Sequence, residues 1–250
     1  MTDLWTIEKA IHGEGFSVIC GVDEAGRGPL AGPVCAAAVV LPVGYLPEGL
    51  NDSKKLSERK REILFPLIQK NASDFSIAFA TVDEIEKLNI LQATFLAMNR
   101  AISGLRILPE LALIDGNRDS GICMDSRCVV GGDGKCASIA AASILAKVSR
   151  DREMIQLAEK YPQYGFDKHK GYGTKAHYEA IMKYGPCPAH RMSFLRSLYE
   201  KKRSLESGVN NRRHYSWRKK PIRFLRETSD ADWEKWISLQ KKPVTSSLWR

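Results

Sequence analysis

The chain has 250 residues, of which 44% are hydrophobic and 27% are charged, a composition typical of a soluble globular domain. A chain of this length buries enough apolar surface to fold without disulfides or a structural metal. Residues 1–17 lack a basic segment that leads into an apolar one, and no apolar run approaches roughly 18 residues. We therefore expect no secretory signal, no membrane span, and a cytoplasmic protein with reduced cysteines.

The net charge of +9 favours a polyanionic partner, and most of this charge lies in one segment. Residues 208–250 contain eleven Lys and Arg against four acids, together with four of the five tryptophans. We predict one core-bearing domain over residues 1–207 and a basic, Trp-rich tail over 208–250. Two interpretations of the tail stay open: a basic arm that contacts phosphates, or a short helix docked through Trp233 and Trp236.

Apolar periodicity predicts the first elements in chain order. Val18–Val22 and Pro33–Leu41 are typical of strands, with a Gly-rich turn between them. Ser57 is a suitable N-cap for a helix. Four apolar residues share one face of this helix: Ile63, Leu64, Leu67 and Ile68. A strand at Phe75–Val82 and a long amphipathic helix at Asp83–Ser103 follow.

The second half of the chain continues the alternation of strands and helices. Short strands are predicted at Leu111–Ile114 and Cys128–Val130, and the Ala-rich stretch Ala137–Lys160 predicts a helix whose small residues suit close packing. Two further helices are predicted at 174–183 and Met192–Leu205. Strands that alternate with helices predict an α/β fold in which helices flank a mixed sheet.

Acidic residues follow three of the predicted strands. Asp23 and Glu24 come directly after Val18–Val22, Asp115 follows the strand at 111–114, and Asp133 follows the strand at 128–130. An isolated acidic pair most often only caps a turn, but three strand ends that carry acids favour a common site. Clustered carboxylates repel one another unless cations neutralise them, and oxygen ligands suit Mg²⁺ or Mn²⁺.

Other sites fail on residue spacing. A phosphate-binding loop would need a glycine at position 129, which is Val. Cys187 and His190 lack a second pair with the spacing of a tetrahedral zinc site. Asp119 and Asp125 are further candidate acids, and Asp151 is more simply a helix-surface or packing charge.

Five motifs together resemble ribonuclease HII and occur in the order found in that family. They are GVDEAGRGPLAGPV (21–34), NDSKKLSERKRE (51–62), LIDGN (113–117), GDGKCASIAAASILAKVSRDREM (132–154) and YPQYGFDKHKGYGTKAHYEAI (161–181). The resemblance covers about residues 17–200 and is more specific than any single motif. It implies a ribonuclease H-like fold with a helical C-terminal region.

The resemblance also implies an endonuclease that cleaves the RNA strand of RNA/DNA hybrids and cuts at single ribonucleotides embedded in DNA. By position in the motifs, Asp23, Glu24, Asp115 and Asp133 match the four metal-binding acids of the family. Hydrolysis assisted by two Mg²⁺ or Mn²⁺ ions, which leaves 5′-phosphate and 3′-hydroxyl ends, agrees with four acids on neighbouring strand ends. We expect a monomer with no membrane partner.

Substrate contacts are expected at several further positions. Gly26 and Gly28 let the backbone approach a sugar closely, and Arg27 between them can contact a phosphate, although a Gly-x-Gly segment is also typical of an ordinary tight turn. The resemblance implies that this loop and Tyr172 read the RNA–DNA junction. Three lysines in the motifs suit phosphate contacts: Lys54, Lys55 and Lys147. Gly131 stands where the family often has a basic residue, and residues beyond 207 match no family motif.

Two other functions compete with this interpretation. A non-catalytic module could bind RNA/DNA hybrids with the same fold, and another metal-dependent nuclease or transferase could act on other nucleic acids. Four acids argue against the first, because a binding module gains nothing from buried mutual repulsion. The Gly-Arg-Gly loop together with Tyr172 argues against the second, because it suits recognition of a ribose 2′-hydroxyl.

Overall fold

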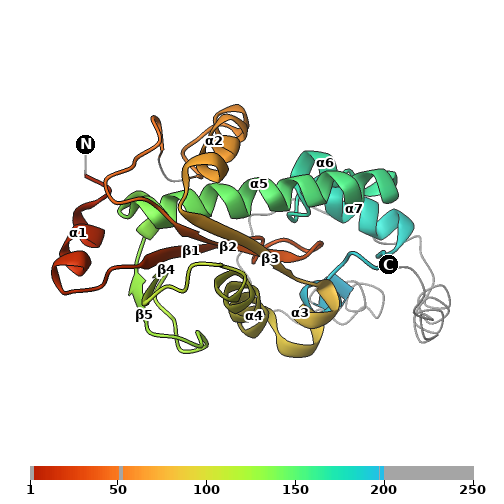
Figure 1. The fold of residues 1–250 in the computed structure, drawn as a ribbon. Helices are drawn as coiled ribbons and strands as arrows, with labels where there is room; N and C mark the ends of the chain where they lie inside the picture. The colour runs from red at the N-terminus through yellow and green to blue at the C-terminus, as the bar shows by residue number, and fades with distance from the viewer. Residues whose placement is uncertain (1–2, 51–52, 197, 200–250) are drawn as a thin grey trace, which may run out of the picture.

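A five-stranded mixed sheet forms the centre of the part of the chain that the computed structural model describes, residues 3–50, 53–196 and 198–199 (Figure 1). The strands are β1 (Ile19–Ala25), β2 (Val34–Val40), β3 (Asp74–Ala80), β4 (Leu111–Asp115) and β5 (Ser126–Val129). Their order across the sheet is β3-β2-β1-β4-β5. The pairs β1–β2 and β2–β3 are antiparallel, and β1–β4 and β4–β5 are parallel. The predicted mixed sheet is confirmed.

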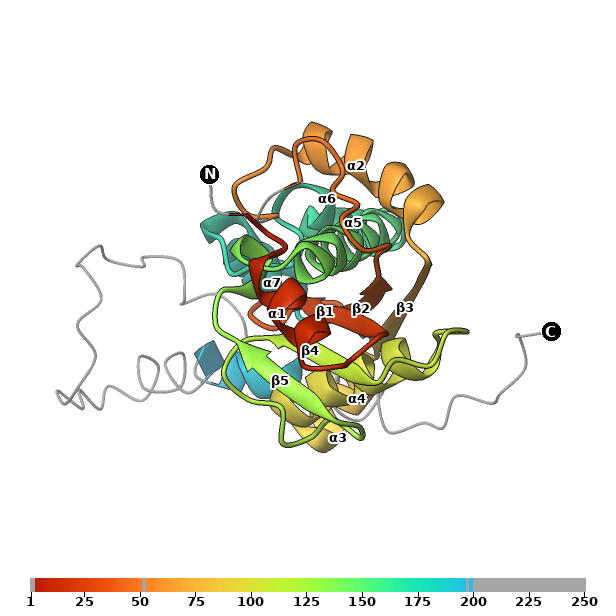
Figure 2. The same cartoon turned by 60° about the vertical axis from the view of Figure 1, so that its left-hand side comes forward.

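Helices cover both faces of the sheet. They are α1 (Thr6–Gly13), α2 (Glu58–Asn71), α3 (Val82–Leu88), α4 (Ile90–Ser103), α5 (Ala137–Lys160), α6 (Phe166–His169) and α7 (Lys175–Tyr184), with short 3₁₀ turns at Gly132–Gly134 and Pro162–Tyr164. Helices α5 and α2 lie on one face, and α3 and α4 lie on the other (Figure 2). No helix of the described residues is both long enough and apolar enough to cross a membrane.

The small residues of β2 and α5 make this layered packing possible. Residues of β2 alternate between the two faces, so Ala37 packs toward α5 while Ala36 and Ala38 pack toward α4, and all three are fully buried. Gly21 on β1 allows the closest approach, because a Cβ there would lie 2.2 Å from the backbone carbon of Ser138 on α5. Helix α5 is thereby seated directly on the central strands.

The structure corrects several predicted boundaries. The helix predicted at 83–103 is two helices, because Asn89 has φ 71° and its side chain caps α4 by accepting from the N–H groups of Leu91 and Gln92. On α2, Ile63 and Leu67 are exposed, because Leu64, Phe65 and Ile68 make the buried face instead. Leu64 and Ile68 of the predicted apolar face are therefore confirmed, and Ile63 and Leu67 are not part of it.

The predictions fail at the start of the chain and are confirmed in part near its end. Helix α1 was not predicted, although its single buried face carries Glu8 and Ile11. Residues 192–196 are helical, in agreement with the start of the predicted helix at Met192–Leu205. The remainder of that helix, the segment after 207 and the predicted basic tail lie outside the described residues.

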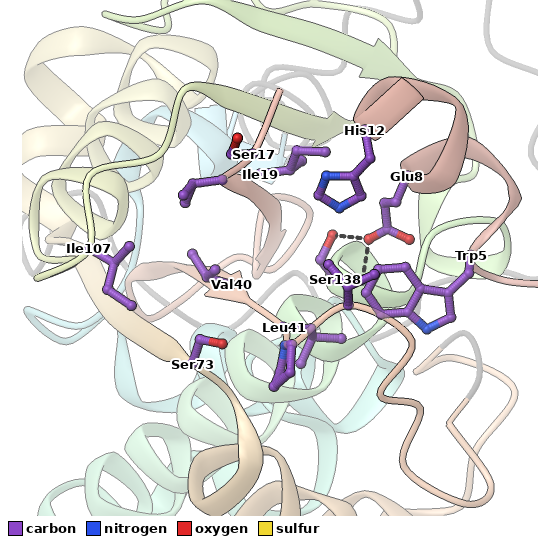
Figure 3. Close-up of a pocket in the computed structure, with 13 residues that line it drawn as sticks. Trp5, Glu8, His12, Ser17, Ile19, Val40, Leu41, Ser73, Ile107 and Ser138 are labelled. Carbon is purple, nitrogen blue, oxygen red and sulfur yellow. Dashed lines mark hydrogen bonds between the residues drawn. The ribbon is translucent and has the colours of Figure 1, made fainter. Parts of the chain in front are cut away.

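A buried carboxylate joins α1 to the start of α5. Helix α5 has no side-chain cap from its own N-cap residue, Cys136. Instead Glu8 accepts hydrogen bonds from the backbone N–H groups of Ala137 (3.1 Å) and Ser138 (2.9 Å), and from the Ser138 hydroxyl. Figure 3 shows Glu8 and Ser138 in the pocket that Trp5 and His12 also line. Glu8 is thus a helix cap supplied from another element.

We predict that Glu8→Ala lowers the free energy of unfolding by about 1–3 kcal/mol, because two buried N–H groups of α5 lose their acceptor. Chemical denaturation followed by circular dichroism measures the change. Glu48→Ala is the matched control, since Glu48 is exposed. Equal stability of the two variants would contradict the capping role.

Candidate metal centre and nucleic-acid interface

Three carboxylates meet where the parallel strands end. Val22 of β1 pairs with Ile114 of β4, so the next residue on each strand, Asp23 and Asp115, lie side by side. Asp133 joins them from the 3₁₀ turn after β5. One ligand oxygen from each of the three residues lies within 4.8 Å of the others. The predicted convergence of these acids is therefore what the strand register produces.

The acids on β1 are placed differently from the prediction. The strand does not end before them but continues to Ala25, and Asp23 and Glu24 pair with Ala37 and Ala36 of β2. Only the pairing with β4 ends before Asp23. This arrangement is more rigid than a loop, because β2 holds the backbone of both acids on one side while their other side is open to the cluster.

Burial and like charge dominate the electrostatics of the cluster. Asp23 is 4% exposed, and burial, Glu24 and Asp115 raise its pKa well above 3.8. The N–H of Glu24 and the hydroxyl of Ser143 oppose this rise. A buried carboxylate beside two others is costly in its charged form, so the geometry favours a bound cation or proton.

Glu24 lies at the border of the cluster. Its carboxylate accepts a hydrogen bond from Nη1 of Arg27 at 3.2 Å and is not one of the three that share the 4.8 Å space. Burial raises the pKa of Glu24, Arg27 opposes that rise, and the charge of Asp115 adds to it. Glu24 thus interacts electrostatically with the three aspartates but is not one of the residues whose oxygens converge.

Fixed hydrogen bonds orient the oxygens of the acids. The N–H of Gly132 donates to Oδ1 of Asp115 at 2.7 Å, and the Nζ of Lys54 lies 3.3 Å from Oδ2 of Asp133. Burial lowers the pKa of Lys54, but the negative charges of Asp133, Asp23 and Asp115 together raise it by more. The pKa of Lys54 is therefore higher than its ordinary value. The donor set consists of carboxylate oxygens alone, which fits a hard divalent cation such as Mg²⁺ or Mn²⁺.

The three predicted lysines occupy different surroundings. Lys54 contacts the cluster through Asp133, and its side chain is 78% exposed. The Nζ of Lys55 lies near Gly134, 3.9 Å from where a Cβ would be. Lys147 is bound to Asp151 at 2.7 Å within α5. Asp151 is therefore a buried packing charge, and the structure brings Lys54 and Lys55, more than Lys147, toward the acids.

Two glycine-containing loops lie together beside the acids. The N–H of Leu30 donates to the carbonyl of Gly171 at 2.8 Å, and a Cβ on Gly28 would lie 3.8 Å from the ring of Tyr172. Gly26 has φ 99°, and a Cβ there would lie 1.9 Å from Nε of Arg150. Tyr172 is 45% exposed. The structure thus joins the predicted Gly26–Gly28 loop to Tyr172, with the tyrosine ring accessible.

Sequence reasoning missed the residues beneath these loops. Arg150 and Arg191 are buried and donate to backbone carbonyls of both loops. Nothing in the charge pattern distinguishes them from surface arginines. Arg150 carries one signal, because it lies on the buried side of the Ala-rich helix, where a long polar side chain is unusual.

Other candidate sites do not assemble. Among residues 3–50, 53–196 and 198–199, the three aspartates are the one group of His, Cys, Asp or Glu that could hold an ion, which leaves Asp119 and Asp125 outside it. All six cysteines are free, as expected, and Cys187 contacts His190 without completing a zinc site. The pocket of Figure 3 lies at the start of β1, away from the acids.

Comparison with known proteins places the chain in a family. A model of the family described as Ribonuclease HII matches residues 20–197. Ribonuclease HII of Endomicrobium trichonymphae is 53% identical over 194 residues, which are 77% of this chain and 92% of that protein. The ribonuclease HII of Shewanella halifaxensis is 56% identical over 191 residues, which are 74% of this chain and 94% of that protein.

Solved structures agree with this placement. The crystal structure of ribonuclease H2 from Pyrococcus horikoshii OT3 matches with a TM-score of 0.62 at 29% identity, over 74% of this chain and 98% of that one. Bst-RNase HIII, crystallised in complex with Mn²⁺, has the same fold, with a TM-score of 0.60 at 21% identity over 78% and 73% of the two chains. The fold, the acidic cluster and these relatives agree. The chain belongs to the ribonuclease HII family of metal-dependent endoribonucleases, which cleave RNA in RNA/DNA hybrids.

Proposed function

We propose that this protein cuts RNA/DNA hybrids and also single ribonucleotides embedded in duplex DNA, by two-metal-ion hydrolysis that leaves 5′-phosphate and 3′-hydroxyl ends. The observation that carries the proposal is the joint position of the acids and the loops. Asp23, Asp115 and Asp133 gather within 4.8 Å at the strand ends, and the Gly26–Gly28 loop continues directly from the strand that carries Asp23. Cleavage chemistry and ribose recognition are thereby built on one strand.

The acids of the chain suit divalent cations in this reaction. Asp23, Asp115 and Asp133 would hold the ions, with Glu24 at the border of the site. When bound, Mg²⁺ or Mn²⁺ supplies an activated water and stabilises the charge on the leaving oxygen. The protein keeps the ligands in place through β2, the N–H of Gly132 and the N–H of Glu24, which limits reorganisation during the reaction.

The loops suit recognition of one ribose. A 2′-hydroxyl is the group that distinguishes RNA from DNA, and contact with it requires close backbone approach. Gly28 has no side chain beside the Tyr172 ring, so a sugar can reach the backbone there while it stacks on the tyrosine. Arg27, Lys54 and Lys55 provide positive charge for flanking phosphates.

A non-catalytic hybrid-binding role is less consistent with the site. Burial of three like charges is unfavourable, and nucleic acid would add more negative charge beside them. One comparison tests the proposal: incubation with Mg²⁺ or Mn²⁺ and three duplexes of one sequence, which are all-DNA, RNA/DNA and DNA with one ribonucleotide. We expect cleavage of the second and third only, with a 3′-hydroxyl on the upstream product. Binding of the hybrid without any cleavage would contradict the proposal.

Neutralising one of the acids should have opposite effects on two properties: the stability of the metal-free protein should rise, and its binding of metal should weaken. We predict that Asp23→Asn stabilises the metal-free protein at neutral pH, because burial, and then the charges of Glu24 and Asp115, raise the pKa of Asp23 and make its charged form unfavourable. The pKa of Asp23 is higher in the folded protein than in the unfolded chain, so folding favours its protonated form. The wild type therefore loses stability as the pH rises from about 4, and Asp23→Asn loses less. Added Mn²⁺ should raise the unfolding temperature of the wild type more than that of the variant. Equal Mn²⁺ effects on both would show that Asp23 is not a ligand.

Cleavage should depend on the same acids. We predict that Asp115→Asn lowers the cleavage rate about a thousandfold or more, as expected for loss of a ligand that contributes several kcal/mol in the transition state. Binding of the hybrid should persist, and Asp133→Asn should be milder if it supports one ion only. Asp125→Asn is the control, because Asp125 is exposed and outside the cluster. Full activity of Asp115→Asn at saturating Mg²⁺ would exclude this assignment.

Tyr172 should matter most where one ribose is read among deoxyriboses. We predict that Tyr172→Ala lowers cleavage at a single embedded ribonucleotide about tenfold more than cleavage within a long hybrid, where every sugar is a ribose. Tyr172→Phe keeps the ring and is the matched control. Equal losses on both substrates would indicate a structural or general role for Tyr172.

A further inference from the structure

The buried guanidinium of Arg191 has all of its hydrogen-bonding capacity directed at one loop. Its exposed fraction is 0%, and its five N–H groups each have an acceptor. Nε donates to Gly32 at 2.9 Å, Nη1 to Arg27 and Pro29 at 2.9 Å each, and Nη2 to Gly26 at 2.6 Å and Gly32 at 2.8 Å. Every acceptor is a backbone carbonyl of residues 26–32.

This arrangement is an unusual way to bury a charge. A buried arginine is ordinarily paired with a carboxylate, but the described residues provide Arg191 with carbonyl acceptors only. Burial lowers the pKa of Arg191 to about 9 and the nearby Arg150 adds to the effect, while the charge of Glu86, which makes no hydrogen bond to Arg191, opposes it. Its five hydrogen bonds tie the guanidinium to the backbone of residues 26–32, which includes the Gly26–Gly28 loop.

The bonds to Arg191 also determine where the N–H groups of the loop point. All described peptide bonds are trans, so the N–H of each peptide points opposite to its carbonyl. Because the carbonyls of Gly26 and Arg27 point toward Arg191, the N–H groups of Arg27 and Gly28 point away from it. Within the described part of the chain, neither N–H donates a backbone hydrogen bond. Gly28 also adjoins the ring of Tyr172.

A second buried arginine keeps the two loops in register. Nη2 of Arg150 donates to the carbonyl of Ala31 at 3.1 Å, and Nη1 donates to that of Lys170 at 3.0 Å. The Tyr172 segment is thereby fixed to the loop that Arg191 shapes. A lysine cannot reproduce either role, because its three donors diverge from one atom, whereas the guanidinium is a planar fork with five.

We propose that Arg191 is a positioning residue for ribonucleotide recognition: its guanidinium holds the carbonyls of residues 26–32 so that the N–H groups of Arg27 and Gly28 are presented as a pair of donors to the ribose 2′-hydroxyl. The inference rests on the proposed function, in which this loop reads the ribose. Arg191 acts through the loop and touches no substrate itself.

Discrimination between two duplexes tests the proposal. Arg191→Lys and Arg191→Gln are made in the Asp115→Asn background, so that substrate is bound without being cut. The dissociation constants for all-DNA duplex and for the same duplex with one ribonucleotide are measured at one salt concentration, and their ratio is the discrimination. We expect both variants to lose about tenfold or more of the parent's ratio, because the loss of oriented donors affects only the ribose. Binding of all-DNA duplex, which depends on phosphate contacts, should change little.

Ile68→Ala in the same background is the control for simple destabilisation, since Ile68 of α2 is fully buried in the core. It should leave the ratio unchanged. A parent that binds both duplexes equally would overturn the proposed reading of the ribose and the inference with it. A parent that discriminates, with Arg191 variants that discriminate equally well, would overturn the inference alone.

If neither Arg191 variant folds, amide hydrogen exchange of the Asp115→Asn protein decides. The N–H groups of Arg27 and Gly28 should exchange rapidly in the free protein and slow on the ribonucleotide duplex but not on all-DNA duplex. Slowing on the ribonucleotide duplex alone supports the orientation that Arg191 imposes. Unchanged exchange on that duplex overturns it.

Discussion

The parallel pairing of β1 with β4 is the constraint on which the rest of the site depends. Because Val22 lies opposite Ile114, Asp23 and Asp115 come next to each other at the same edge, where like charges must be tolerated in a buried place. The antiparallel pairing with β2 on the other side keeps the backbone of Asp23 from moving away from that repulsion. The sheet therefore stores an electrostatic cost that a divalent cation relieves.

Helix α5 connects that edge to the rest of the molecule. At its first turn Glu8 satisfies the free N–H groups, and Gly21 allows the helix to lie directly on β1. The helix is buried from its first residue, Ala137, and farther along Arg150 donates to the carbonyls of Ala31 and Lys170 in the two loops. One helix therefore fixes the sheet and the loops in a single frame.

The site combines two opposite electrostatic solutions. At the strand ends, buried carboxylates of like charge repel one another and so favour a bound cation. Beneath the loops, the buried cations Arg150 and Arg191 donate their hydrogen bonds to backbone carbonyls and so tie the two loops to the core. The first arrangement suits chemistry on a phosphodiester, and the second suits a shape that recognises a sugar.

The sequence by itself determined most of the elements and the family. Strand and helix patterns are local, so the strand before Asp115 and the helix at 137–160 were predicted close to their observed bounds. The family motifs identified the acids and Tyr172, because their order along the chain is distinctive. The break at Asn89 was missed, since apolar periodicity continues across it while a single positive φ ends the helix.

Only the tertiary structure decided how those residues meet. The distance between Asp23, Asp115 and Asp133 follows from strand register, which no local pattern encodes. The hydrogen bonds of Arg191 likewise cannot be read from the sequence, because their acceptors lie about 160 positions earlier in the chain. The sequence gives the type of each side chain, but the packing of distant segments determines its partners. Those partners determine whether a buried charged side chain binds a cation, caps a helix or holds a loop.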